Sequence, residues 1–274
     1  MATKFERDTA VTRVDDDEFD AAVDPGWLVH RGPNGGYVAA IILRALSARV
    51  DDATRAPRSF TVHYVSPADV GPIRVTTSIE RIGRSVTSCS ARLHQDDRLV
   101  ALAVAAFAAP RPGPEFCDVT MPEVMAVRDI PAVEIPAEAP EIARRWDMCW
   151  ALGDPPWMQS PPSSEAVAGG WIRLEDPQPA DACVVAAITD AWVPPVFSRI
   201  REPIIVPTVD LTIHFRSSLP LAETGADDYV FAVFRTDAAN EGFLEESGEV
   251  WSAGGTLLAQ SRQLAAVIPF TSPL

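Results

Sequence analysis

Two polar side chains stand alone in apolar stretches of the sequence, and both have the chemistry to act on a substrate. Asp190 is the only charged residue between Cys183 and Phe197. Gln263 is a long amide on a strand face that otherwise carries small or apolar side chains. Burial of a carboxylate is unfavourable unless the group is used or satisfied, and a buried amide needs a partner or a water molecule. A carboxylate in such a place can serve as a general base.

Each residue also has a purely structural interpretation. Asp190 can cap the end of a helix or face solvent in the following turn, and Gln263 can tie neighbouring strands together. Comparison with an earlier, similar stretch favours the chemical interpretation, because the equivalent positions there are Leu43 and Ala105. Neither can do polar chemistry. We therefore expect one site per chain, carried by the second half of the sequence.

The similarity between the two halves predicts a duplicated unit. Three short matches occur in the same order along the chain, which favours two copies of one unit over chance. The matched segments are 59–64 with 210–215, 38–41 with 185–188, and 99–101 with 257–259.

The sequence of each copy predicts a loop, then a largely apolar helix, then several strands. The first helix opens at Pro33-Asn34-Gly35-Gly36 and covers about 37–50, with apolar residues almost all round, as in a helix buried on most sides. This order implies four antiparallel strands around one buried helix in each unit. The expected strands are 58–65, 73–82, 85–94 and 99–107, and the second copy has a helix at 182–192 and strands at 208–216, 229–237, 248–253 and 257–268.

Three regions follow from this pattern. They are an N-terminal unit (1–110), a proline-rich connection (111–180) and a C-terminal unit (181–274) with the candidate catalytic residues. The connection is expected to be mostly irregular, with one short helix near 141–148.

Several motifs in these units resemble the acyl-CoA thioesterase II family, over about residues 26–110 and 180–270. The motifs are Gly35-Gly36-Tyr37, the strand 59–64 and Arg81-Ile82-Gly83-Arg84-Ser85 in the first unit, and Thr189-Asp190, Pro207-Thr208-Val209-Asp210 and 258–263 in the second. The resemblance implies an α+β double hotdog fold, in which each unit wraps a curved antiparallel sheet around a buried helix. It also implies hydrolysis of acyl-CoA thioesters to free fatty acid and CoA.

The resemblance further implies that Asp190, Thr208 and Gln263 orient the attacking water. Asp190 would be the general base, no covalent intermediate would form, and neither a metal nor a cofactor would be needed beyond the CoA of the substrate. Strict alternation places Thr208 on the face of Asp210, so its direction depends on whether Pro207 shifts the local register.

Five further residues are candidates for substrate binding. Asn34, Gly35 and Gly36 open a helix whose N-terminal N–H groups can hold the oxyanion, and their alternative role is a tight helix-entry turn. Arg81 and Arg84 can meet a CoA phosphate, and their alternative is a solvated turn.

Composition restricts the possible partners. Lys and Arg number 23 against 38 Asp and Glu, and the net charge of −15 argues against binding to nucleic acid or to an anionic membrane. The longest apolar run, 99–109, is shorter than the roughly 18 residues that cross a bilayer, and we expect no membrane insertion. With no apolar leader after the N-terminus, we expect a cytoplasmic protein. The four cysteines lack metal-binding spacing.

Two other functions stay open on this fold. A hydratase or dehydratase would need an Asp and a His together near a helix start, and a non-catalytic protein would bind acyl-CoA or lipid in the apolar groove between units.

Open sheet edges and apolar outer faces also predict a homo-oligomer, most simply a dimer.

Overall fold

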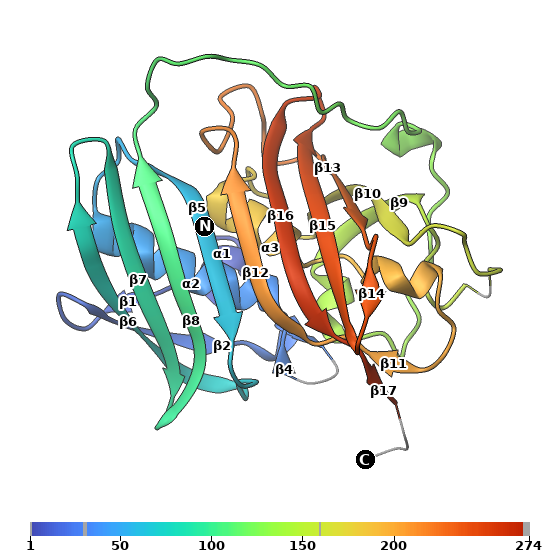
Figure 1. Cartoon of the computed structure of the whole chain (residues 1–274), viewed down its shortest axis with the longest axis horizontal. Helices are drawn as coiled ribbons and strands as arrows, with labels where there is room; N and C mark the ends of the chain where they lie inside the picture. The colour runs from blue at the N-terminus through green and yellow to red at the C-terminus, as the bar shows by residue number, and fades with distance from the viewer. Residues whose placement is uncertain (1, 30–31, 159, 271–274) are drawn as a thin grey trace.

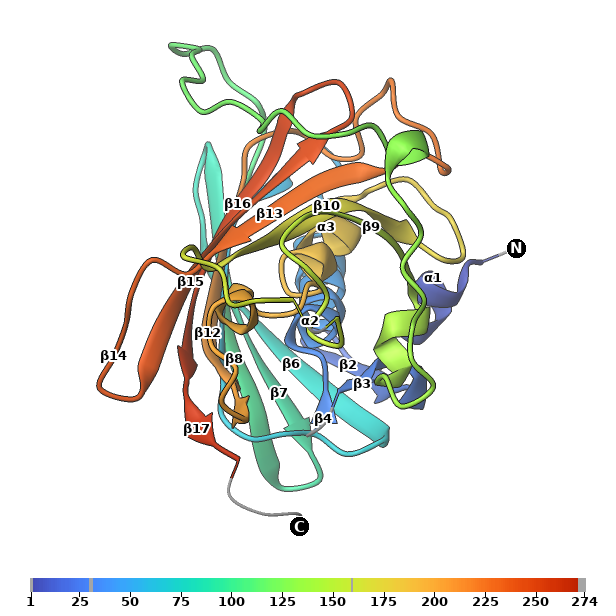
Figure 2. The same ribbon diagram turned by 90° about the vertical axis from the view of Figure 1, so that its right-hand side faces the viewer.

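The computed structural model describes residues 2–29, 32–158 and 160–270, and its main feature is one long, curved antiparallel sheet (Figure 1). Thirteen strands of the described residues belong to this sheet. Helices α2 (Gly35–Val50) and α3 (Ala182–Ile188) lie on its concave side (Figure 2). This arrangement confirms the predicted α+β double hotdog.

The first unit has the strand order β2-β6-β7-β8-β5 around the long helix α2, with β1 beside β2 at the sheet edge. Its main elements are β1 (Thr12–Arg13), β2 (Glu18–Val23), α2 (Gly35–Val50), β5 (Ala56–Tyr64), β6 (Gly71–Ile82), β7 (Val86–Gln95) and β8 (Arg98–Ala108). Its short elements are α1 (Lys4–Asp8), η1 (Pro25–Trp27), β3 (Leu28–Val29) and β4 (Gly32–Pro33).

The second unit repeats this order as β10-β13-β15-β16-β12, with β9 beside β10. Its main elements are β9 (Trp146–Leu152), β10 (Val167–Leu174), α3 (Ala182–Ile188), β12 (Thr208–Phe215), β13 (Val230–Arg235), β15 (Phe243–Ser252) and β16 (Leu257–Ala266). Its short elements are η2 (Val127–Asp129), η3 (Glu141–Arg144), η4 (Pro195–Ser198), β11 (Ile204–Ile205), β14 (Ala239–Asn240) and β17 (Ile268–Pro269).

The segment 111–180 contains more regular structure than the sequence predicts. After β8 the chain crosses to the far end of the sheet, where β9 and β10 form and β10 pairs with β13 (Figure 1). The expectation of an irregular connection is therefore wrong for 146–152 and 167–174. Prolines concentrate before β9 and in the loop between β9 and β10, and their local signal hides the two strands.

The two units join through β5 and β12, the strands whose sequences match at an offset of 151 residues. Thr61 pairs with Thr212 at the centre of this antiparallel contact, and their hydroxyl oxygens lie 3.0 Å apart. Because equivalent residues meet each other, the chain has an internal approximate two-fold axis at this point. The pairing buries one edge of each unit's sheet.

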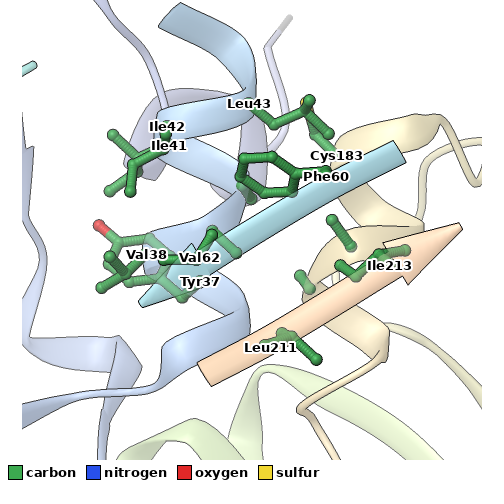
Figure 3. Packing of buried hydrophobic residues seen from close by; sticks show 14 of the residues in the cluster. Tyr37, Val38, Ile41, Ile42, Leu43, Phe60, Val62, Cys183, Leu211 and Ile213 are labelled. Atoms are coloured by element: carbon green, nitrogen blue, oxygen red, sulfur yellow. The ribbon is translucent and has the colours of Figure 1, made fainter. Parts of the chain in front are cut away.

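The core lies between the sheet and the two helices. Helix α2 is apolar almost all round and buries ten residues, and α3 buries six. Figure 3 shows part of the shared core, where α2 side chains such as Ile41 and Ile42 share one buried cluster with Val62 of β5 and Ile213 of β12. Within the part of the chain that the structure describes, no helix is both long and apolar enough to cross a membrane.

Candidate active site

Asp190 lies in the turn that follows α3, and its carboxylate contacts the start of α2 in the other unit. The helix expected over 182–192 ends at Ile188, where the Thr189 hydroxyl donates to the Ala186 carbonyl at 2.7 Å. The Gly36 N–H donates to Asp190 Oδ2 at 3.0 Å. This contact therefore joins the second unit to the first at Asp190.

Close approach of these elements depends on the two glycines that open α2. A Cβ at Gly36 would lie 2.5 Å from the Ala187 carbonyl oxygen and 3.0 Å from Asp190 Cβ. A Cβ at Gly35 would lie 2.9 Å from Asp190 Oδ2. Any larger residue would push the turn away from the helix, so glycine is needed here for space.

Asn34 and Tyr64 make further hydrogen bonds where the start of α2 meets the Asp190 turn. Asn34 caps α2 by accepting from the Tyr37 N–H at 2.9 Å, and its Nδ2 donates to Asp190 at the backbone oxygen (2.7 Å) and at Oδ2 (3.0 Å). The Tyr64 hydroxyl donates to the Gly35 carbonyl at 2.7 Å. Burial and the nearby Asp190 charge raise the pKa of Tyr64 well above its usual range, which keeps this donor protonated.

These contacts correct the predicted role of the helix start. Gly36 and Asn34 direct their donors at the Asp190 carboxylate, so the structure does not support an oxyanion hole built from this loop. The helix N-terminus stabilises a negative charge, as expected, but the charge belongs to the protein's own aspartate.

Burial makes Asp190 a stronger base than an ordinary aspartate. It raises the pKa of this carboxyl to about 6, although hydrogen bonds from Gly36, Gly35, Gln263 and Asn34 act in the opposite direction. The carboxyl group is therefore mostly ionised at pH 7. Asp190 as a whole residue is half-buried, and its carboxyl group lies in the buried part.

Gln263 reaches the site from β16, where it faces the concave side and is buried. Its Oε1 accepts a hydrogen bond from the Thr208 hydroxyl at 2.9 Å. The β12–β16 ladder shifts register between Thr208 and Asp210, which marks a β-bulge. The bulge turns Thr208 away from the face that alternation predicts and toward Gln263. All three predicted catalytic residues therefore lie in one region.

Glu246 is a member of this cluster that the sequence interpretation missed. It is 5% exposed, it pairs with Gln263 across the β15–β16 ladder, and its Oε1 accepts from Gln263 Nε2 at 2.7 Å. Burial, followed by the charge of Asp190, raises the pKa of Glu246 to about 8. Alternation with the apolar Leu244 and Val250 would have placed it inward, but the expected strand began only at 248.

Arg81 and Arg84 lie far from this cluster. They sit at the β6–β7 turn, next to the strand end where Val86 pairs with Ala108. Ala108 in turn pairs with Ala56, at the opposite end of β5 from Tyr64. Tyr64 lies eight residue steps along β5 from Ala56, or about 26 Å at the usual rise. The structure therefore does not place the two arginines at the site.

The equivalent region of the first unit contains apolar side chains in place of the polar ones. The caps of α2 and α3, Asn34 and Asp181, are 147 residues apart, and the same offset relates Leu43 to Asp190. The ladders relate Ala105 to Gln263 and Cys89 to Glu246. The first-unit residues Leu43, Ala105 and Cys89 are all buried in the core, and Leu43 is seen in Figure 3. The polar cluster therefore occurs once per chain among the described residues.

Comparison with known proteins agrees with this architecture. Residues 23–108 match the family model of the acyl-CoA thioesterase N-terminal domain, and residues 119–267 match that of the C-terminal domain. The chain has no significant match among curated proteins.

Solved structures show the same fold over the full length. A hot dog protein of unknown function from Alicyclobacillus acidocaldarius is 26% identical, with a TM-score of 0.88 and 100% of both chains covered. A candidate thioesterase II from Thermobifida fusca YX is also 26% identical, with a TM-score of 0.85 and 97% of each chain covered. The acyl-CoA thioesterase II TesB2 of Mycobacterium marinum is 19% identical, with a TM-score of 0.76 over 97% of this chain and 98% of its own. With both domain models matched in order across most of its length, the chain belongs to the acyl-CoA thioesterase family of thioester hydrolases.

Proposed function

We propose that this enzyme hydrolyses acyl-CoA thioesters to free fatty acid and CoA by direct attack of a water molecule bound between Asp190, Thr208 and Gln263. The observation that supports the proposal is the meeting of a carboxylate of raised pKa, in the turn after α3, with a hydroxyl from β12 and an amide from β16. These groups can accept a proton from a water and orient its oxygen.

The hydrogen bonds of Thr208 and Gln263 decide which group can accept from the water and which can donate to it. The Thr208 hydroxyl donates its hydrogen to Gln263 Oε1, so its oxygen has lone pairs left to accept from the water. One Gln263 N–H donates to Glu246, and its second N–H, which lies on the Asp190 side, can donate to the oxygen of a water that enters between Gln263 and Asp190. Asp190 would accept the water proton.

The reaction then balances without a covalent intermediate. Asp190 takes a proton as the water oxygen attacks the thioester carbonyl carbon, and the tetrahedral intermediate collapses by breaking the C–S bond. The proton on Asp190 passes to the departing thiolate, which restores the carboxylate. A Thr208 nucleophile is disfavoured because its proton points at an amide oxygen, which is too weak a base to remove it.

A thiol-release assay tests this function. Free CoA is measured with short-, medium- and long-chain acyl-CoA, and the proposal predicts release with at least one of them. A hydratase would change the acyl chain without releasing CoA, and a binding protein would do neither. Either result contradicts the proposal. Mass spectrometry of the protein during turnover should detect no acylated chain, and an acyl adduct would contradict direct attack by water.

A further inference from the structure

Gln263 can orient a water only if its own amide is held in place. A glutamine side chain has three rotatable bonds, and its amide carries two donor hydrogens and an acceptor oxygen. The Thr208 hydroxyl fixes the oxygen end, at 2.9 Å from Oε1. One contact leaves the amide plane free to swing about that oxygen. A second anchor, at the nitrogen, is needed to direct the remaining N–H toward Asp190.

Glu246 occupies the position of that second anchor. Its Oε1 lies 2.7 Å from Gln263 Nε2, and the two residues are directly opposite each other on paired strands. Both side chains are buried, with 5% exposure for Glu246 and 6% for Gln263, so bulk water does not compete for this hydrogen bond. The bond takes one of the two Nε2 hydrogens and leaves one for the site.

We propose that Glu246 is a positioning residue for hydrolysis, which fixes the amide of Gln263 so that its second N–H faces the water held by Asp190. Glu246 itself does not touch the reacting atoms in this account. The inference rests on the proposed function, because it assigns Glu246 a task within that mechanism.

The fold does not require a carboxyl group at this position. Cys89 occupies the same register in the first unit, opposite Ala105, and is 2% exposed within the core. A small apolar side chain therefore satisfies the sheet there. Placing a carboxyl in the second unit is unfavourable, because burial and the Asp190 charge both oppose its ionisation. A structural role alone gives no reason to keep it.

The acceptor oxygen, rather than the charge, is what the proposal needs. Glu246→Gln keeps an oxygen that can accept from Gln263 Nε2, whereas Glu246→Met has similar volume and offers no comparable acceptor. We expect Glu246→Met to lower kcat at least about ten-fold with little change in KM, since misdirected catalytic groups mainly slow the chemical step. Glu246→Gln should stay within about three-fold of the original kcat. Cys89→Ala, at the matched register, should leave kcat unchanged.

A double-mutant cycle with Gln263→Ala separates positioning from general damage. If Glu246 acts through Gln263, Glu246→Met should cause no further loss of kcat in a chain that already carries Gln263→Ala. Additive losses in the double variant would overturn the proposal. It would also be overturned by full kcat in Glu246→Met, or by equal losses in Glu246→Gln and Glu246→Met.

CoA release by the unaltered chain and by Glu246→Met distinguishes a wrong positioning role from a wrong function. If the unaltered chain releases no CoA from any acyl-CoA, the function itself is refuted. If the unaltered chain is active and Glu246→Met is equally active, only the positioning role is refuted. Thermal unfolding of Glu246→Met completes the test: replacing a buried carboxyl should not lower Tm, and a folded, slow variant with normal KM supports the proposal.

Discussion

Replacing Asp190 with asparagine should make the protein more stable and nearly inactive at the same time. Asparagine keeps the shape of the side chain and an oxygen that can accept from the Gly36 N–H, but it cannot take a proton from water. Loss of a general base lowers turnover by about 100- to 10,000-fold, and we expect kcat to fall within that range.

The gain in stability follows from the pKa of the carboxyl. In the unfolded chain Asp190 ionises with its ordinary pKa of 3.8, whereas burial raises the value to about 6 in the folded protein. Between these two pH values the folded state binds more protons, so stability falls as pH rises through the window and stays lowered above it. The full difference corresponds to about 3 kcal/mol at pH 7, and the imperfect fit of an asparagine NH₂ beside Asn34 reduces the expected gain to about 1–3 kcal/mol.

Denaturant unfolding at pH 7 and at pH 4, together with the thiol-release assay, measures both effects. The stability difference between Asp190→Asn and the unaltered chain should be largest at pH 7 and should shrink toward pH 4. Asp181→Asn is the matched control: Asp181 caps α3, and asparagine is an equally good cap, so neither stability nor kcat should change. A variant that keeps normal turnover would refute the base assignment, and one that is less stable at pH 7 would refute the buried-charge reasoning.

Three other predictions concern the glycine contact, the asymmetry of the units and assembly. Gly36→Ala should lower the free energy of unfolding by about 1–3 kcal/mol and reduce kcat, because its Cβ would lie 2.5 Å from the Ala187 carbonyl oxygen. The control is Gly113→Ala, where the added Cβ meets open space, and it should change neither quantity in the same denaturation and thiol-release assays. Gln263→Ala should abolish most CoA release while Ala105→Ser lowers mainly Tm, and titration with a non-hydrolysable substrate analogue should give one site per chain rather than two. Sedimentation at micromolar concentration should show a dimer, and a species of 29.6 kDa alone would contradict this expectation.

Much of the fold can be predicted from local pattern. Expected and observed bounds agree closely for β5 to β8 of the first unit, because alternating burial and clear turns mark those strands. Strands β9 and β10 could not be found in this way. Strand β10 pairs with β13, which lies more than 50 residues further along the chain, and β9 pairs with β10 alone among the described strands. Local sequence signals do not report such contacts.

The site could be predicted in part. Asp190 and Gln263 are visible as isolated polar groups in apolar surroundings, and the internal repeat strengthens both. The direction of Thr208 could not be derived, because a bulge of one residue reverses which face a side chain takes and leaves no unambiguous mark in sequence. The oxyanion prediction for Gly36 failed for a different reason: the helix start binds an anion, but only the structure shows that the anion is Asp190.

The pH dependence of kcat/KM for CoA release reports directly on whether Asp190 acts as a carboxylate base. Below its pKa of about 6 the base is protonated, so kcat/KM should fall about ten-fold per pH unit, and above it the rate should reach a plateau. The residual activity of Asp190→Asn should lack this dependence. A value of kcat/KM that stays flat from pH 5 to pH 7, or a fall below pH 6 that survives in Asp190→Asn, would show that Asp190 is not the base.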